Sequence, residues 1–175
     1  MKVTTLQTRR FLQFITLAIA AGVSGVLFAG DDEHDEILPL ADNAKWRVEC
    51  ASCHALYHPA LLPERSWRKM MSSLNQHFGE NAKLDAATQK EITEFLAAHA
   101  ADRSTNRRVQ KIARSVPAGE TPLRATDTAY FIHKHNEIRA DIWQRKAIGS
   151  KSNCAACHAE AEKGNFDEHR IRIPR

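Results

Sequence analysis

Hydrophobic residues follow the period of an α-helix in several segments of the chain. In Ser66–Phe78 the apolar positions recur at intervals of three and four residues, and Gly79 follows the segment. Thr128–Trp143 shows the same spacing, and Asp85 stands where it would cap a further helix that runs to Ala101. Such spacing is typical of a helix with one buried face. The pattern predicts a mostly helical protein, and the low aromatic content of 7% disfavours an all-β sandwich.

Residues 1–30 have a different pattern. A basic head with Lys2, Arg9 and Arg10 precedes an apolar stretch from Phe11 to Ala29, and strongly acidic sequence follows. This order is typical of an export signal. The apolar stretch is also nearly long enough to span a bilayer, so an uncleaved N-terminal anchor is the alternative. In both cases we expect the body of the protein in the periplasm, in contact with the membrane only through an uncleaved N-terminus.

Composition and charge narrow the class of protein. The 175 residues are 43% hydrophobic and 26% charged, which excludes a collagenous or wholly disordered chain. Because there is one long apolar run, a multi-span membrane protein is excluded too. The formal net charge is +4, but three of the positive charges lie in residues 1–30, which carry no acidic residue. The remainder is nearly neutral, so nucleic acid is not an expected partner.

All four cysteines lie in two Cys-x-x-Cys-His motifs, at residues 50–54 and 154–158. In a c-type haem site the two thiols add to the vinyl groups of the porphyrin, and the adjacent histidine binds the iron. The motifs predict two haem c groups. The predicted attachment residues are Cys50, Cys53, Cys154 and Cys157, and the predicted proximal ligands are His54 and His158.

Three other interpretations of the cysteines are less favourable. A thioredoxin-like redox pair expects a strand followed by a helix, whereas the flanks of both motifs look helical. A zinc clamp requires two pairs that are far apart in sequence to converge. Both the zinc clamp and a disulfide framework leave the two adjacent histidines unexplained.

The group opposite each proximal histidine decides whether the iron is closed or open to other ligands. On a helical projection of Thr128–Trp143, His135 falls on the same side as Phe131 and Ile138. His133 falls on the opposite side, toward water. The projection predicts His135 as the second ligand of the iron bound by His158.

His77 is the candidate second ligand for the first motif, because it lies at the edge of the apolar face of Ser66–Phe78. Several alternatives stay open at this point. His77 could instead be a helix C-terminal histidine stabilised by the helix dipole. Met70 or Met71 could bind the iron, although methionine on an apolar face usually packs in a core. His99, on the apolar face of the helix after Asp85, is a further candidate.

The chain divides into five predicted segments. These are a signal or anchor at residues 1–30, an acidic spacer at 31–36, a first haem domain at 37–102, a basic helix and linker at 103–122, and a second haem domain at 123–175. Neither haem domain is large enough to form much of a core from its own side chains. We therefore expect the porphyrins to complete the core, and the chain without haem to be unfolded or molten.

Longer stretches around these motifs resemble the dihaem cytochrome c family, in its small bacterial exported form. They read WRVECASCHALYHPALLPERSWRKMM, LNQHFGE, LRATDTAYFIHKHNEI and KSNCAACHAEAEKGNF, with a terminal IRIP. The resemblance implies an all-α fold of two small helical c-type haem domains packed together, the first of them cytochrome c-like. It also implies two histidines on each iron, His54 with His77 and His158 with His135.

The resemblance implies a function as well. We expect an electron carrier rather than an enzyme, with low-spin haems whose reduction potentials lie below those of His/Met cytochromes. The alternative is a dihaem peroxidase or a ligand-binding haem protein with one open iron. The implied partners are redox proteins, namely a small oxygen-binding monohaem cytochrome and a b-type membrane cytochrome upstream.

Overall fold

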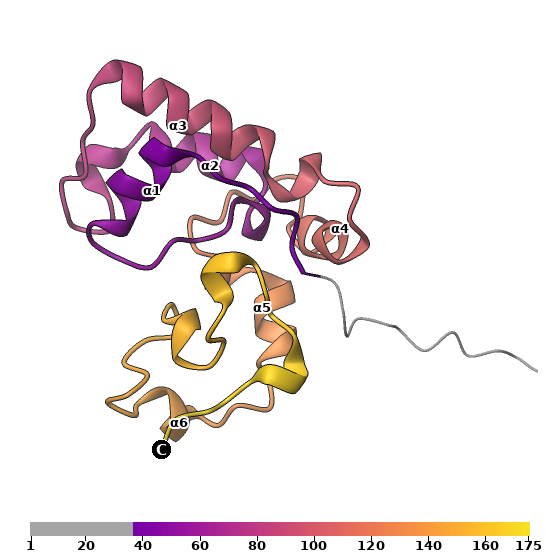
Figure 1. Cartoon of the computed structure of the whole chain (residues 1–175). Helices are drawn as coiled ribbons and strands as arrows, with labels where there is room; N and C mark the ends of the chain where they lie inside the picture. Colours follow the sequence, from indigo (N-terminus) through magenta and orange to yellow (C-terminus); the bar gives the residue numbers. More distant parts are fainter. Residues whose placement is uncertain (1–36) are drawn as a thin grey trace, which may run out of the picture. The chain divides into compact units, whose positions relative to one another are not determined.

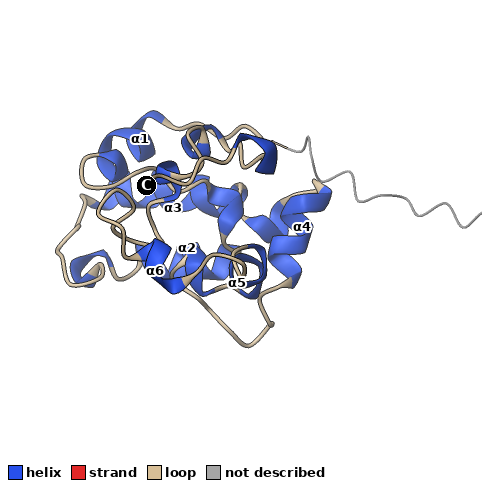
Figure 2. Ribbon diagram, turned by 90° about the horizontal axis from the view of Figure 1, so that it is seen from below, coloured by secondary structure: helices blue, strands red, loops and turns tan. Residues whose placement is uncertain are grey.

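A computed structural model of the protein describes residues 37–175. Within this range the regular structure is helical, without strands, apart from an isolated β-bridge between His77 and Glu80 (Figure 2). The predicted all-α fold class is confirmed. The predicted signal or anchor at 1–30 and the spacer at 31–36 lie outside the described residues. From residue 37 onward, the helices are too short or too polar to cross a membrane.

The α-helices of the described part are α1 (Ala44–Ala51), α2 (Glu64–Met71), α3 (Ala86–Ala98), α4 (Arg107–Arg114), α5 (Ala129–Lys134) and α6 (Ala140–Trp143) (Figure 1). Short 3-10 helices lie between and after them: η1 (Pro59–Leu61), η2 (Leu74–Gln76), η3 (Ala101–Arg103), η4 (Ala125–Asp127), η5 (Cys154–Ala156), η6 (Ala161–Lys163) and η7 (Glu168–Arg170). These residues belong to one compact unit. The boundaries predicted for the two haem domains stay predictions.

Side-chain oxygens fix the starts of several helices. The Asp85 carboxylate accepts hydrogen bonds from the N–H groups of Ala87 and Thr88, so the predicted cap of α3 is confirmed. Asn43, Asn106 and Thr128 begin α1, α4 and α5 in the same way. Each such cap stabilises its helix by about 1 kcal/mol. The caps at Asn43 and Thr128 fix the starts of α1 and α5, which lead into Cys50 and His135.

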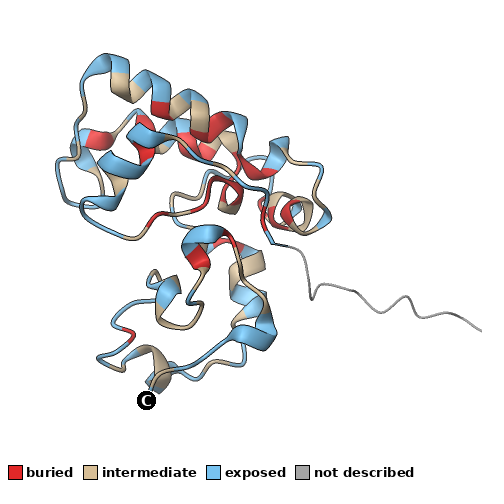
Figure 3. Ribbon diagram, in the orientation of Figure 1, coloured by how far each residue is buried: buried red, intermediate tan, exposed pale blue. Residues whose placement is uncertain are grey.

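The hydrophobic core lies mainly among α1 to α4 (Figure 3). Trp46, Trp67 and Ile92 bring α1, α2 and α3 together in one cluster, and α3 lies across the other two helices in Figure 1. Val109 and Ile112 of α4 form a second cluster with residues of η1 and η3. The first motif is thus attached to a well-packed set of helices.

The C-terminal part contributes little to this core. From residue 123 to the end, the buried hydrophobic residues of the structure are Ile148 and Ala161. A segment of this size with so few buried side chains cannot hold a fold through its own hydrophobic contacts. This supports the expectation that a bound group completes its core.

The helix predicted over Ser66–Phe78 is wrong at its C-terminal end, because α2 stops at Met71. The hydroxyls of Ser72 and Ser73 each donate to the carbonyl of Lys69, at 2.8 and 3.0 Å. Such side-chain bonds offer the backbone an alternative to a further helical turn. After η2 the chain reverses at Phe78, whose φ of 53° lies in the left-handed region.

Two further helix predictions need correction. The segment Thr128–Trp143 forms two helices, because α5 ends before His135 and α6 begins at Ala140. The Phe131 carbonyl accepts from both the backbone N–H and the ring of His135, which closes the last turn of α5. The helix expected to reach Ala101 ends at Ala98, because the Ala101 N–H donates outside the helix, to Leu62 O at 2.9 Å.

Candidate functional site

All eight residues predicted to attach or bind haem line one cavity of about 760 Å³. A volume of this size is typical of a pocket for a large organic ligand. The residues come from both halves of the described chain: Cys50, Cys53, His54, His77, His135, Cys154, Cys157 and His158.

The first motif begins at the end of α1. Cys50 lies in the last turn of the helix, and Cys53 and His54 follow the helix end. The ring of His54 makes a 2.7 Å hydrogen bond from Nδ1 to Ala55 O. Because a carbonyl oxygen can only accept, Nδ1 carries the proton and Nε2 keeps its lone pair. A ring held through one nitrogen in this way is typical of a metal-binding histidine.

His77 lies opposite His54. The two ring centroids are 6.0 Å apart and the ring planes differ by 21°. Two histidine–metal bonds of about 2.0 Å and two ring radii of about 1.1 Å, from bonds of about 1.33 Å, predict a centroid separation of about 6.2 Å for two imidazoles on one iron. The observed spacing fits that value. Backbone hydrogen bonds of 2.8 and 3.0 Å between His77 and Glu80 hold the loop that presents the ring.

The other candidates for this position are placed differently. Met70 and Met71 also line the cavity, but Met71 is 4% exposed and lies in the cluster between α1, α2 and α3, and Met70 packs against that cluster. His99 is exposed, and its Nδ1–H donates to Phe95 O at 2.9 Å. The residue whose ring faces His54 is therefore His77.

The second pair is formed by His135 and His158. Their ring centroids are 6.2 Å apart and their planes differ by 77°. The Nδ1–H of His135 donates to Phe131 O at 2.8 Å, and the two side-chain rings stack with centroids 4.0 Å apart. His133 is exposed, as the helical projection predicts. Unlike the first motif, the second lies in a 3-10 helix, η5, so the expectation of helical flanks is wrong here.

The pKa values of three imidazoles that line the cavity, those of His77, His135 and His158, are lowered. Burial, and then the neighbouring His135 and Arg108, lower the pKa of His158 to about 4. Burial is also the main cause that lowers the pKa of His135 and, with the nearby His54, that of His77. A neutral ring nitrogen offers a lone pair to a metal. The environment of these three histidines therefore favours the neutral, metal-binding form over the charged form.

The thiols do not have the properties of a redox pair. Burial, with a smaller effect of Glu49, raises the pKa of Cys50 to about 11, and burial raises the pKa of Cys154 and Cys157. A thioredoxin-like centre needs a lowered thiol pKa. Between residues 37 and 175, no three His, Cys, Asp or Glu side chains gather as a metal cluster, and all four thiols are free. The zinc and disulfide interpretations thus find no support in this part of the chain.

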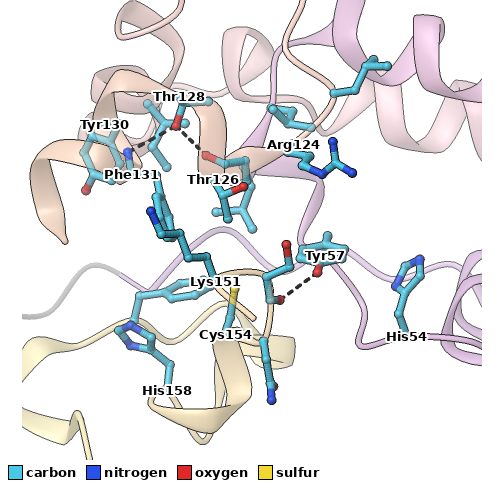
Figure 4. Close-up of a pocket in the computed structure, with 18 of the residues that line it drawn as sticks. His54, Tyr57, Arg124, Thr126, Thr128, Tyr130, Phe131, Lys151, Cys154 and His158 are labelled. Atoms are coloured by element: carbon cyan, nitrogen blue, oxygen red, sulfur yellow. Dashed lines mark hydrogen bonds between the residues drawn. The ribbon is translucent and has the colours of Figure 1, made fainter. Parts of the chain in front are cut away.

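Several polar residues of the cavity were not found from the sequence. The Tyr57 hydroxyl donates to Ser152 O at 2.7 Å and so ties the segment after the first motif to the segment before the second (Figure 4). The Tyr130 hydroxyl is buried and has no hydrogen-bond partner among the described residues. An unpaired buried hydroxyl costs about 1–3 kcal/mol of stability.

These features fit two c-type haems. Paired thiols and facing imidazoles at the spacing of one metal ion match the vinyl groups and the iron of the porphyrin. Tyr57 could have been suspected from its place three residues after His54. Tyr130 and Ser152 carry no local signal, because their roles depend on long-range contacts.

Comparisons with known proteins agree with this description. Residues 46–166 match the family described as dihaem cytochrome c. The chain is similar to a diheme cytochrome c from Rhodobacter sphaeroides, with 42% identity and a TM-score of 0.65, over 73% of this chain and 100% of that chain. It is also similar to a diheme cytochrome c from Shewanella baltica OS155, with 37% identity and a TM-score of 0.62, over 77% of this chain and 95% of that chain. No curated protein matches the chain.

Proposed function

Because the chain belongs to the dihaem cytochrome c family, whose haems transfer electrons, we propose that it carries single electrons through two bis-histidine haems. Members of the family have two covalently bound haem c groups. This chain has four cysteines, two in each motif, so every cysteine is used in attaching the two haems. His54 and His77 are the proposed ligands of the first iron, and His158 and His135 those of the second.

The observation that carries the proposal is the spacing of the two imidazole pairs. Centroid distances of 6.0 and 6.2 Å are close to the roughly 6.2 Å expected for two rings on one iron. With a histidine on each side, neither iron keeps a position for oxygen, peroxide or carbon monoxide. This supports a carrier over a peroxidase or a ligand-binding protein.

When bound, each haem supplies an iron that alternates between the ferric and ferrous states. The task of the chain is to keep the ligands in place while that charge changes. Carbonyl oxygens of Ala55 and Phe131 fix the rings of His54 and His135. Phe131 and Phe166 pack on the rings of the second pair. Ligands held in this way move little on electron transfer, which keeps the reorganisation small.

Single substitutions of the distal histidines test the ligand assignment. In the purified holoprotein, His135→Ala should convert one haem to a high-spin form that binds carbon monoxide, and His77→Ala should do the same for the other haem. The matched controls are His133→Ala and His99→Ala, which remove exposed histidines and should leave both haems low-spin.

If His135→Ala fails to fold, His135→Met keeps a ligand at the position and should raise the potential of one haem. Carbon monoxide binding by the wild-type protein would favour the alternative function, a peroxidase or a ligand-binding haem protein, over an electron carrier. A high-spin haem in His133→Ala, with His135→Ala unchanged, would overturn the assignment of the second ligand.

The proposal extends to location and partners. The basic and apolar sequence of residues 1–30 supports a periplasmic protein, either exported or anchored. The family resemblance supports redox partners of two kinds, a small oxygen-binding monohaem cytochrome that receives electrons and a b-type membrane cytochrome that supplies them. Stopped-flow mixing of the reduced protein with an oxidised monohaem cytochrome of this kind tests the first partner, and slow, non-saturating transfer would argue against it.

A further inference from the structure

Arg124 connects the two segments that carry the distal histidines. It directly precedes η4, which leads into α5 and His135. Its guanidinium lies over the ring of Phe78, 4.0 Å from the centroid. Phe78 follows His77 in sequence and adopts the left-handed conformation that turns the chain there. A cation from the start of the C-terminal part is therefore held beside the distal ligand of the first site.

The charge of Arg124 is directed at the first site. Arg124 lines the cavity, and in Figure 4 its side chain extends over Tyr57, on the side where His54 lies. The rings of Tyr57 and His54 have centroids 5.3 Å apart.

No acidic side chain from residue 37 onward pairs with Arg124. Other arginines of the same part do form ion pairs, such as Arg68 with Glu64 and Arg139 with Asp141. A haem brings two propionate carboxylates into its site, and a guanidinium binds a carboxylate through strong, charge-assisted hydrogen bonds. A cavity-lining arginine without a carboxylate of its own is suited to that role.

We propose that Arg124 binds a propionate of the haem attached at Cys50 and Cys53 and raises the reduction potential of that haem. The inference rests on the proposed function, in which both irons cycle between two oxidation states. Reduction adds one negative charge to the haem, and a nearby fixed positive charge stabilises the reduced form. The position of Arg124 beside Phe78 and Tyr57 makes this effect larger for the first haem than for the second.

A redox titration of the holoprotein, followed by EPR so that the two low-spin signals are measured separately, tests the proposal. Arg124→Gln should lower the midpoint potential of the haem bound by His54 and shift the other much less. Arg124→Lys keeps the charge and should retain most of the wild-type potential. The control Arg139→Gln removes an exposed arginine that does not line the cavity and should leave both potentials unchanged.

The signal of the first haem is identified as the one lost in His77→Ala. Unchanged potentials in Arg124→Gln would overturn the proposal, and so would a shift confined to the second haem. If Arg124→Gln loses haem or folded structure, Arg124→Lys and Arg124→Met replace it. A wild-type potential of the first haem in Arg124→Lys and a lowered potential in Arg124→Met would then support the proposal, and equal potentials would overturn it. Carbon monoxide binding by the wild-type protein would instead count against the proposed function, so the two failures are distinguishable.

Discussion

Gly164 is a sharp test of how the C-terminal part is joined to the rest of the chain. It follows η6 with a φ of 75°, and its carbonyl accepts from the Leu38 N–H at 3.0 Å. A methyl group added at this position would lie 3.0 Å from Leu38 Cβ and 3.2 Å from His58 Cδ2. Gly164→Ala therefore imposes both a strained backbone and an overlap on a segment close to the second motif.

The two costs can be separated. The left-handed backbone costs a residue with a Cβ about 1–2 kcal/mol, and overpacking costs about 1–3 kcal/mol, so Gly164→Ala should lower the free energy of unfolding by about 2–5 kcal/mol. Gly149 has a similar φ of 71° but no atom within 4 Å of the added Cβ. Gly149→Ala should carry the backbone cost alone, about 1–2 kcal/mol.

Gly119 supplies the third member of the series, because it has neither a positive φ nor a close neighbour. Gly119→Ala should be neutral or stabilise by up to about 1 kcal/mol, since it restricts the unfolded chain. The assay is guanidinium unfolding of the three holoproteins, followed by far-UV circular dichroism. Equal losses in Gly164→Ala and Gly149→Ala would refute the close approach of Gly164 to Leu38 and His58.

Three further predictions concern pH, spectroscopy and the role of haem. His58 is 4% exposed, its Nε2–H donates to Pro39 O and its Nδ1 accepts from the Ala60 N–H. Because burial lowers its pKa, the unfolded chain binds more protons in acid, and the free energy of unfolding should fall as the pH drops below 6.5. The slope due to this residue is at most about 1.4 kcal/mol per pH unit, and chemical denaturation at several pH values should show a smaller slope in His58→Gln. The ring planes differ by 21° in the first pair and by 77° in the second. We therefore expect two distinct low-spin EPR signals, a rhombic signal from the first haem and a signal with large g-anisotropy from the second. Two identical rhombic signals would contradict the 77° angle. Few side chains beyond residue 123 are buried, so we expect the haems to complete the core. Protein made without cytochrome c maturation should therefore lack a native near-UV dichroism spectrum, and a native-like spectrum would refute the role of haem in folding.

The residues of the site could be predicted where the signal is local. The spacing within each Cys-x-x-Cys-His motif follows from the chemistry of haem attachment and does not depend on the rest of the fold. The preference for His135 over His133 rested on a helical projection. The structure places His135 in the cavity and exposes His133. Although α5 ends at Lys134, the His135 N–H still donates to Phe131 O, so the helical turn extends to His135.

Helix ends were less predictable, since they depend on contacts that hydrophobic periodicity does not record. The hydroxyls of Ser72 and Ser73 end α2, and the ring of His135 closes α5. His77 reaches the side opposite His54 because the chain leaves the helix and reverses at Phe78. A straight helix through His77 would have suggested a different direction for the ring.

Contacts between distant segments could not be predicted at all. The hydrogen bond from Tyr57 to Ser152 joins residues 95 positions apart, and Arg124 meets Phe78, which lies 46 positions earlier in the chain. No pattern in a single sequence pairs such residues. They are the contacts that place the two motifs in one cavity.

The central claim is that two histidines bind each iron. Optical and EPR spectra of the purified holoprotein, oxidised and reduced, with and without carbon monoxide, test it most directly. Two histidines on each iron predict two low-spin haems, no methionine–iron charge-transfer band and no spectral change with carbon monoxide. A high-spin fraction that binds carbon monoxide would contradict it, because one iron would then lack its second histidine.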